Sequence, residues 1–177
     1  MPSEGKYARR EWERRFLLEG LPSEFAVTAV RGIVDRYIVG TTLRLRQQIS
    51  REGQTVYKLT QKLPGGRSGS LQGLITTMYI TQREFEIFAA LPSMQLIKTR
   101  YSVPPLGIDV FEGTLCGLVL AEAEFNSGEE ASSLAPPAFA VREVTADRRF
   151  NGGSLAAASR EEVAAWLAED GLKLNPL

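Results

Sequence analysis

Like-charged residues recur at every second position in several strand-like segments of the chain. Glu11 and Glu13 stand two apart in EWERRF, and Glu122 and Glu124 do the same in AEAEF. Residues i and i+2 of a β-strand share one face, so each pair presents two carboxylates together. Carboxylates are hard oxygen ligands that suit magnesium or manganese.

Basic residues follow the same spacing. The segments LRLRQ, YKLTQK and IKTRY align Arg44 with Arg46, Lys58 with Thr60 and Lys62, and Lys98 with Arg100. Lys and Arg bind phosphate oxygens, and Arg often does so through two hydrogen bonds. A solvated outer face explains any one such pair, but the repetition across strands favours a shared charged interior.

The segment 117–126 indicates how such an interior forms. One of its faces carries Leu118, Leu120, Glu122 and Glu124, while the opposite face is wholly apolar. In a barrel wrapped by helices, the apolar face packs outward and the charges point into the lumen. Dry, unpaired charges there would cost many kcal/mol, whereas water, a metal and a polyanion would compensate them. A metal–triphosphate complex matches both signs of charge.

The composition describes one soluble domain. The 177 residues are 44% hydrophobic, which is enough for one sizeable core but not for two full domains. Lys and Arg number 21, as do Asp and Glu, and this zero net charge argues against nucleic-acid or membrane partners. Cys116 is the only cysteine and His is absent, which excludes an intrachain disulfide and His-dependent chemistry. With no secretory or membrane-spanning apolar run, these features predict a cytoplasmic protein.

Alternation and frequent turn residues predict a mainly β fold. The expected strands are 11–18, 31–39, 42–50, 55–63, 73–80, 94–103, 107–113 and 117–126, with a short strand near 140–145. One helix is expected after Thr81 and a second over about 159–170, with Ser159 as its N-cap. Residues 63–70 and 126–137 are expected to be loops. The terminal helix, which carries Trp166, is either amphipathic cover or a homodimer contact.

Taken in order, these motifs resemble the CYTH domains, also called triphosphate tunnel metalloenzymes. That family includes thiamine triphosphatases, inorganic tripolyphosphatases and some adenylate cyclases. Its N-terminal Glu-x-Glu-x-Lys strand corresponds to EWERR, in which Arg15 replaces Lys. Further matches follow in family order in TTLRLRQQ, LTQK, IKTRY, GIDVFEGTLCGLVLAEAEF and REVTADRRFNGGSLA. The resemblance covers about residues 8–157 of a single domain, 1–177.

The resemblance implies an α+β fold built on an eight-stranded antiparallel β-barrel that forms a tunnel. Its inward glutamates would hold one or two magnesium or manganese ions, and its inward basic residues would grip a triphosphate. Carried over residue by residue, the metal candidates are Glu11, Glu13, Glu122 and Glu124. The phosphate candidates are Arg15, Arg44, Arg46, Lys62, Lys98 and Arg100, with Lys58 nearer the rim. Asp109 is either a ligand or a partner of Lys98 or Arg100, and Glu143 and Arg149 are either functional or structural.

One strand departs from the family pattern. Many members carry Arg-x-Glu-x-Glu between the LTQK strand and the first helix, and the corresponding positions here are Gly73, Ile75 and Thr77. No Glu occurs between Gly53 and Arg83 in any register. This wall of the tunnel is therefore expected to be apolar or merely hydroxylic.

The family resemblance favours metal-dependent hydrolysis of a triphosphate-containing small molecule, either inorganic tripolyphosphate or an organic triphosphate. A metal-activated water would attack, assisted by Glu11, Glu13, Glu122 or Glu124. One alternative is a non-catalytic module that binds phosphate, polyphosphate or a nucleotide, in which the missing acidic strand marks lost turnover. A second alternative is adenylate cyclase-like activity, which rests on family analogy alone.

Overall fold

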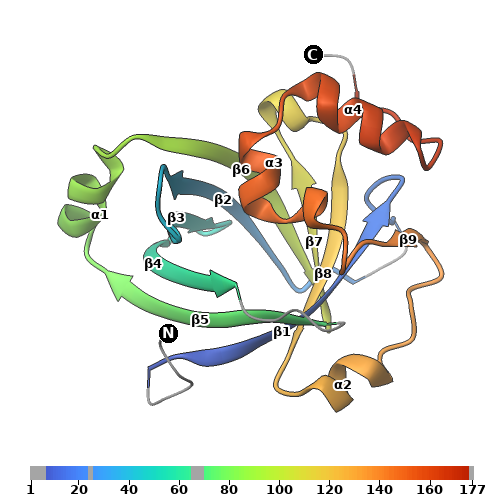
Figure 1. The fold of residues 1–177 in the computed structure, drawn as a ribbon, viewed down its shortest axis with the longest axis horizontal. Coiled ribbons are helices and arrows are strands. Elements are labelled where there is room, and N and C mark those ends of the chain that lie inside the picture. The colour runs from blue at the N-terminus through green and yellow to red at the C-terminus, as the bar shows by residue number, and fades with distance from the viewer. Residues whose placement is uncertain (1–6, 24–25, 65–69, 176–177) are drawn as a thin grey trace.

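The computed structural model describes residues 7–23, 26–64 and 70–175, and its main feature is a closed antiparallel β-barrel (Figure 1). Eight strands follow one another around the barrel in the order β5-β4-β3-β2-β6-β7-β8-β1, and β1 pairs with β5 to close it. This confirms the predicted fold class. The strands are β1 (Arg9–Leu18), β2 (Ala29–Ile38), β3 (Leu43–Ser50), β4 (Thr55–Pro64), β5 (Leu71–Ile80), β6 (Ser93–Val103), β7 (Leu106–Phe111), β8 (Val119–Phe125) and β9 (Ala140–Glu143).

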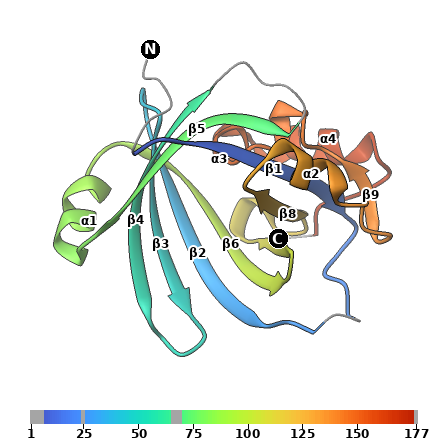
Figure 2. The same ribbon diagram turned by 90° about the horizontal axis from the view of Figure 1, so that it is seen from below.

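One edge of strand β1 pairs with two different strands, one along its N-terminal part and the other along its C-terminal part. Its residues 9–12 pair with β5, and its residues 16–18 pair with the short strand β9. Its other edge pairs with β8 over residues 12–18. Figure 2 shows β1 crossing the barrel while β4, β3, β2 and β6 lie side by side on the opposite wall. The N-terminal half of β1 therefore belongs to the tunnel wall, and its C-terminal half runs on beyond β5.

The helices begin where their capping residues predict. Helix α1 (Gln82–Ala89) has a capping box between Thr81 and Glu84, and α4 (Arg160–Ala168) has one between Ser159 and Glu162. Two helices were not predicted, α2 (Gly128–Ser133) and α3 (Gly152–Ala157). Short 3-10 turns occupy Gly113–Leu115 and Arg148–Phe150. No helix in the described ranges is long and apolar enough to cross a membrane.

The expectation that residues 126–137 form a loop was wrong, because Ser127 caps α2 by accepting a hydrogen bond from the Glu130 backbone. Two acidic residues in the first turn add to this N-terminal signal. In the other expected loop, 63–70, strand β4 continues to Pro64, and residues 65–69 lie outside the described residues.

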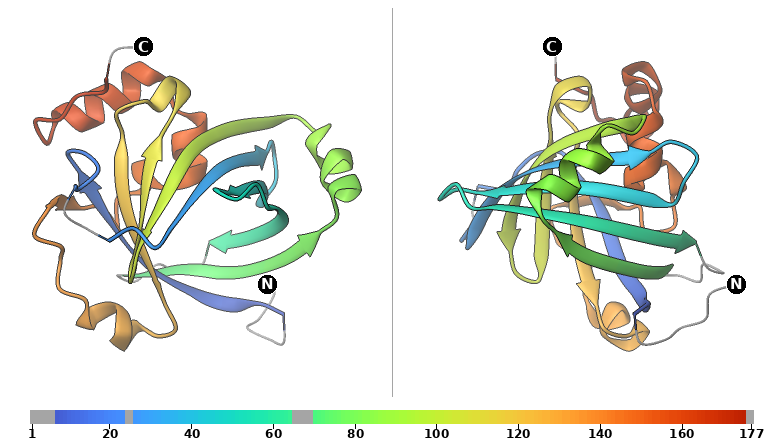
Figure 3. Two further views of the ribbon diagram at one scale, coloured as in Figure 1. Left: turned by 180° about the vertical axis from the view of Figure 1, so that it is seen from behind. Right: turned by 90° about the vertical axis from the view of Figure 1, so that its left-hand side faces the viewer.

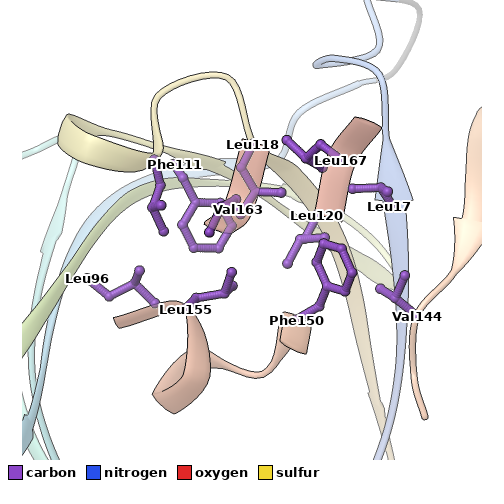
Figure 4. Packing of buried hydrophobic residues seen from close by; sticks show 11 residues of the cluster. Leu17, Leu96, Phe111, Leu118, Leu120, Val144, Phe150, Leu155, Val163 and Leu167 are labelled. Atoms are coloured by element: carbon purple, nitrogen blue, oxygen red, sulfur yellow. The ribbon is translucent and has the colours of Figure 1, made fainter. Parts of the chain in front are cut away.

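One end of the barrel interior is filled by the C-terminal part of the chain (Figure 4). Leu17, Leu118 and Leu120 lie on the same strand faces as the charged residues, yet they are fully buried among Phe150, Leu155, Val163 and Leu167. Figure 3 shows α3 and α4 gathered at this end, away from α1. The mixed face of 117–126 thus divides along its length, with its leucines in an apolar plug and its glutamates in a charged half.

The outer apolar face of β1 and β8 forms a second cluster. Phe16, Leu18 and Ala121 are buried there, with Leu134 and Phe139 packed against them. Helices were expected over this face. The actual cover is α2 together with the irregular segment that follows it, where Gly128 allows the Trp12 ring to approach the backbone.

Candidate active site

A single cavity in the charged half of the barrel collects the predicted site residues. All four predicted metal ligands and all six predicted phosphate ligands line it, from strands β1, β3, β4, β6 and β8. The other lining residues are Arg9, Tyr37, Lys58, Thr60, Ile75, Thr77, Tyr79 and Gly152. Eight of the lining side chains are basic and four are acidic. The cavity is therefore biased towards an anionic ligand.

A chain of ion pairs of alternating sign runs across β6, β7, β8 and β1. Lys98 and Arg100 both contact Asp109, and Arg100 also contacts Glu122. Arg15 continues the chain, with Nε 3.0 Å from Glu122 Oε1 and Nη2 in contact with Glu13. The network compensates the burial of these charges, since an isolated ion in such surroundings costs several kcal/mol.

Two further acidic residues, Glu11 on β1 and Asp35 on β2, are paired with basic residues of β4 and β3. Lys62 Nζ donates a hydrogen bond of 2.7 Å to Glu11 Oε1. Asp35, which is fully buried, accepts hydrogen bonds of 2.6 and 2.7 Å from Arg46 Nε and Nη2. Glu124 differs, because it lies at the rim with 60% of its side chain exposed, 3.6 Å from Arg9.

The surroundings shift the pKa values of Glu13 and Glu122 in opposite directions. Burial raises the pKa of Glu13, and the nearby Glu122 and Glu11 add to that effect against Arg15 and Lys62. Burial also opposes ionisation of Glu122, but Lys98, Arg100 and Arg15 outweigh it and hold its pKa well below the usual range. Of these two carboxylates, Glu13 is therefore the one that an additional cation would stabilise more.

Tyr37 and Arg44 lie together where α3 meets the tunnel. Burial and the nearby Asp35 raise the pKa of the Tyr37 phenol to about 12. In the described part of the chain, Arg44 Nε is buried and has no hydrogen-bond partner. A Cβ atom on Gly152 would lie 1.9 Å from the Tyr37 hydroxyl, so glycine is what allows this approach. The carboxylate oxygen nearest to Arg44 Nε, Asp35 Oδ1, is 3.6 Å away, beyond hydrogen-bond distance, so this guanidinium beside the cavity can still donate to an anionic ligand.

The β5 wall matches the expected departure from the family pattern. Gly73 pairs with Glu11 and Ile75 with Lys62, and both Ile75 and Thr77 line the cavity. Thr77 shares a hydrogen bond of 3.1 Å with Thr60. This wall is therefore apolar and hydroxylic.

The carboxylates suit a metal that arrives together with phosphate. Within the described ranges, no three acidic or Cys side chains converge into a preformed metal centre. Magnesium, however, is often held by one or two carboxylates and completed by water and substrate phosphates. Glu11 and Glu13 share one face of β1, and Glu124 pairs with Glu13 in register on β8. This donor set fits magnesium or manganese.

Three residues of undecided role lie outside the cavity lining. Asp109 is fully buried behind Lys98 and Arg100. Glu143 forms a two-bond ion pair with Arg14 on the exterior, and Arg149 pairs with Asp147 and Glu169 beside the Trp166 ring. All three residues therefore form ion pairs with other residues of the protein.

Asp35 and Tyr37 were not among the predicted site residues. Both lie on the inward face of β2, in the segment IVDRYI. A polar residue at an inward position of a mostly apolar strand was the available signal, but a single acid has no repeat to distinguish it from a surface residue.

The closed barrel and its charged lumen define a tunnel protein of the CYTH type. An inorganic triphosphatase from Nitrosomonas europaea is 36% identical over 153 residues, covering 82% of this chain and 96% of that protein. The chain belongs to the CYTH family, as its motifs predicted. No protein-family model matches it.

Solved structures agree with this assignment. A crystal structure of the inorganic triphosphatase NE1496 has a TM-score of 0.54 and 28% identity, covering 84% of this chain and 95% of that one. A crystal structure of the hypothetical protein NE1496 has a TM-score of 0.55 and 30% identity, covering 84% and 99% of the two chains.

Proposed function

We propose that this protein hydrolyses a phosphoric anhydride bond of a triphosphate, with inorganic tripolyphosphate as the first substrate to test. The observation that carries the proposal is the single cavity lined by four glutamates and eight basic side chains from neighbouring strands. The related inorganic triphosphatase supports the same reaction class.

In this proposal the basic residues bind the three phosphoryl groups. Arg44, Arg46 and Lys62 would act from β3 and β4, Lys98 and Arg100 from β6, and Arg15 from β1. Their positive charge would offset the negative charge that develops on the phosphate oxygens as the P–O bond breaks.

Glu11, Glu13, Glu122 and Glu124 are the proposed holders of magnesium or manganese. When bound, such an ion would supply positive charge to the phosphate and would activate a water for attack. One of the four glutamates would orient the water that attacks phosphorus. That water would attack the terminal phosphorus, the bond between this phosphorus and the bridging oxygen would break, and orthophosphate and pyrophosphate would be released.

The test is phosphate release from tripolyphosphate and from nucleoside and thiamine triphosphates, with magnesium or manganese. Wild type is compared with Glu13→Gln and Glu124→Gln, and with Glu143→Gln as the control outside the tunnel. We expect metal-dependent release in wild type and in the control, and losses of about 10²- to 10³-fold in the two tunnel variants. Equal release in all four proteins would refute the assignment.

A second candidate function is binding without turnover. It is favoured by the β5 wall, where Ile75 and Thr77 stand in place of carboxylates. Tripolyphosphate would then raise the melting temperature of the protein by mass action, while no phosphate is released.

A further inference from the structure

Two fully buried aspartates lie behind the basic residues of the tunnel. Asp35 is on β2 and Asp109 on β7, and both have 0% exposure. Neither lines the cavity. Each aspartate lies next to a strand with two basic residues on the same face. Asp35 is beside Arg44 and Arg46 of β3, and Asp109 is beside Lys98 and Arg100 of β6.

The two aspartates hold their arginines in the same way. Asp35 accepts from Nε and Nη2 of Arg46, and Asp109 accepts from Nε and Nη2 of Arg100 at 2.6 Å each. The other basic residue of each pair is also close, with Arg44 Nε 3.6 Å from Asp35 and Lys98 Nζ bonded to Asp109. In both of these two-bond contacts, Nη1 of the arginine is not bonded to the aspartate.

Charge alone does not account for these carboxylates. An acidic residue next to a phosphate-binding arginine weakens the attraction of the tunnel for an anion. A two-bond contact, however, fixes the plane and the rotamer of the guanidinium before ligand arrives. An arginine that is already ordered loses less side-chain entropy when it binds.

We propose that Asp35 and Asp109 are positioning residues, which hold Arg46 and Arg100 in the orientation that binds triphosphate. This inference rests on the proposed function. It assigns the undecided Asp109 to the support of Lys98 and Arg100 rather than to a metal.

The variants Asp35→Asn and Asp109→Asn separate positioning from charge. Each removes a negative charge from beside the tunnel, so a purely electrostatic role predicts tighter binding of tripolyphosphate. Positioning predicts the opposite. We expect the Kd for tripolyphosphate with magnesium, measured by calorimetry, to rise about tenfold in each variant. We expect kcat/KM to fall about 10²-fold, as for a misplaced binding group.

The matched control is Glu143→Gln, which weakens the two-bond contact to Arg14 outside the tunnel. It should leave both Kd and kcat/KM at wild-type values, whatever its melting temperature. Binding in the aspartate variants that equals or exceeds that of wild type would overturn the inference. Wild type that neither binds nor hydrolyses tripolyphosphate would instead refute the proposed function.

A double-mutant cycle tests whether Asp35 acts through Arg46. After Arg46→Met, the further change Asp35→Asn should no longer raise the Kd, because the group that it positioned is gone. If Asp35→Asn raises the Kd by the same factor with and without Arg46, Asp35 does not act through Arg46, and the inference is overturned. A purely structural role of Asp35 would give that result. If Asp35→Asn does not fold, the same cycle on Asp109 and Arg100 decides the question. If neither aspartate variant folds while both double variants do, the aspartates serve stability and the inference fails.

Discussion

The ammonium of Lys62 and the carboxylate of Glu11 form an ion pair, with 2.7 Å between Nζ and Oε1. The two residues come from β4 and β1, which flank β5 on its opposite edges. Glu11 is buried, whereas 36% of the Lys62 side chain is exposed. A proposed phosphate ligand and a proposed metal ligand therefore neutralise each other in this ion pair. If a metal–triphosphate complex binds, Lys62 would contact a phosphate oxygen and Glu11 would contact the metal, so two new ionic contacts would replace this one.

Replacing Lys62 tests its part in that exchange. Lys62→Met should lower kcat/KM for tripolyphosphate by about 10²- to 10³-fold, because one donor to the charged phosphate is lost. Lys58→Met is the matched control on the same face of β4. Lys58 lies 5.2 Å from the centre of the Tyr79 ring, which is 74% exposed, and its loss should cost less than tenfold. Equal losses in the two variants would contradict a specific role for Lys62.

Gly152 provides a test of how Tyr37 is placed. In Gly152→Ala the new methyl group would lie 1.9 Å from the Tyr37 hydroxyl and 3.0 Å from its ring carbon, so the ring must move. We expect the KM for tripolyphosphate to rise about tenfold or more, because Tyr37 and Arg44 line the same cavity. Gly153→Ala is the neighbouring control, since its nearest contact is 3.6 Å away. A similar rise in KM in both variants would show that any change at the start of α3 has this effect, and would contradict a specific role of Gly152 in placing Tyr37.

The stability contribution of Asp35 should depend on pH. Burial alone would raise the pKa of Asp35, but Arg46 and Arg44 outweigh burial and hold the pKa well below its ordinary value of 3.8. A carboxyl with a lower pKa in the folded state stabilises the fold above pH 3.8, and this stabilisation declines as the pH falls further. Wild type should exceed Asp35→Asn by about 3–5 kcal/mol in free energy of unfolding at pH 7, because the substitution leaves buried arginines without their counter-ion.

Denaturant unfolding of both proteins between pH 7 and strongly acidic pH measures this difference. The gap should stay constant down to about pH 4 and narrow below it. A gap that does not change with pH would show that the two proteins differ through packing rather than through the charge of Asp35.

Much of the barrel was predictable because alternation marks which residues share a face. The segment 117–126 predicted an inward face with Glu122 and Glu124, and both line the cavity. Alternation does not give depth along the tunnel. Glu13 and Glu124 are direct cross-strand partners, yet the Glu13 side chain is 6% exposed and that of Glu124 is 60% exposed. Depth depends on how the strands are tilted and staggered, which a single strand does not encode.

Partner choice was the other property that the sequence did not give. Charge spacing identified Arg46 and Arg100, and pairing of Asp109 with Lys98 or Arg100 was one of the two roles expected for that residue. Nothing in the local sequence joined Arg46 to Asp35, which lies eleven residues away on the neighbouring strand. The plug was also hidden, because Phe150 and Leu155 lie in short segments whose burial depends on tertiary contacts. Such contacts override local propensity.

Phe150 links the stability of the plug to the geometry of the tunnel. It is fully buried, its ring centre lies 6.3 Å from that of Trp166, and it directly precedes residues 151–153, which line the adjoining mouth of the tunnel. Phe150→Ala should therefore cost about 3–5 kcal/mol in free energy of unfolding and also raise the KM for tripolyphosphate.

Leu18→Ala is the control for that variant, because Leu18 is equally buried but belongs to the outer cluster. It should cost about 2–5 kcal/mol without raising KM when both variants are assayed well below their melting temperatures. The two variants then separate loss of stability from displacement of the tunnel mouth. Equal KM values in the two variants would show that the plug supports the barrel as a whole and does not position the residues that follow Phe150.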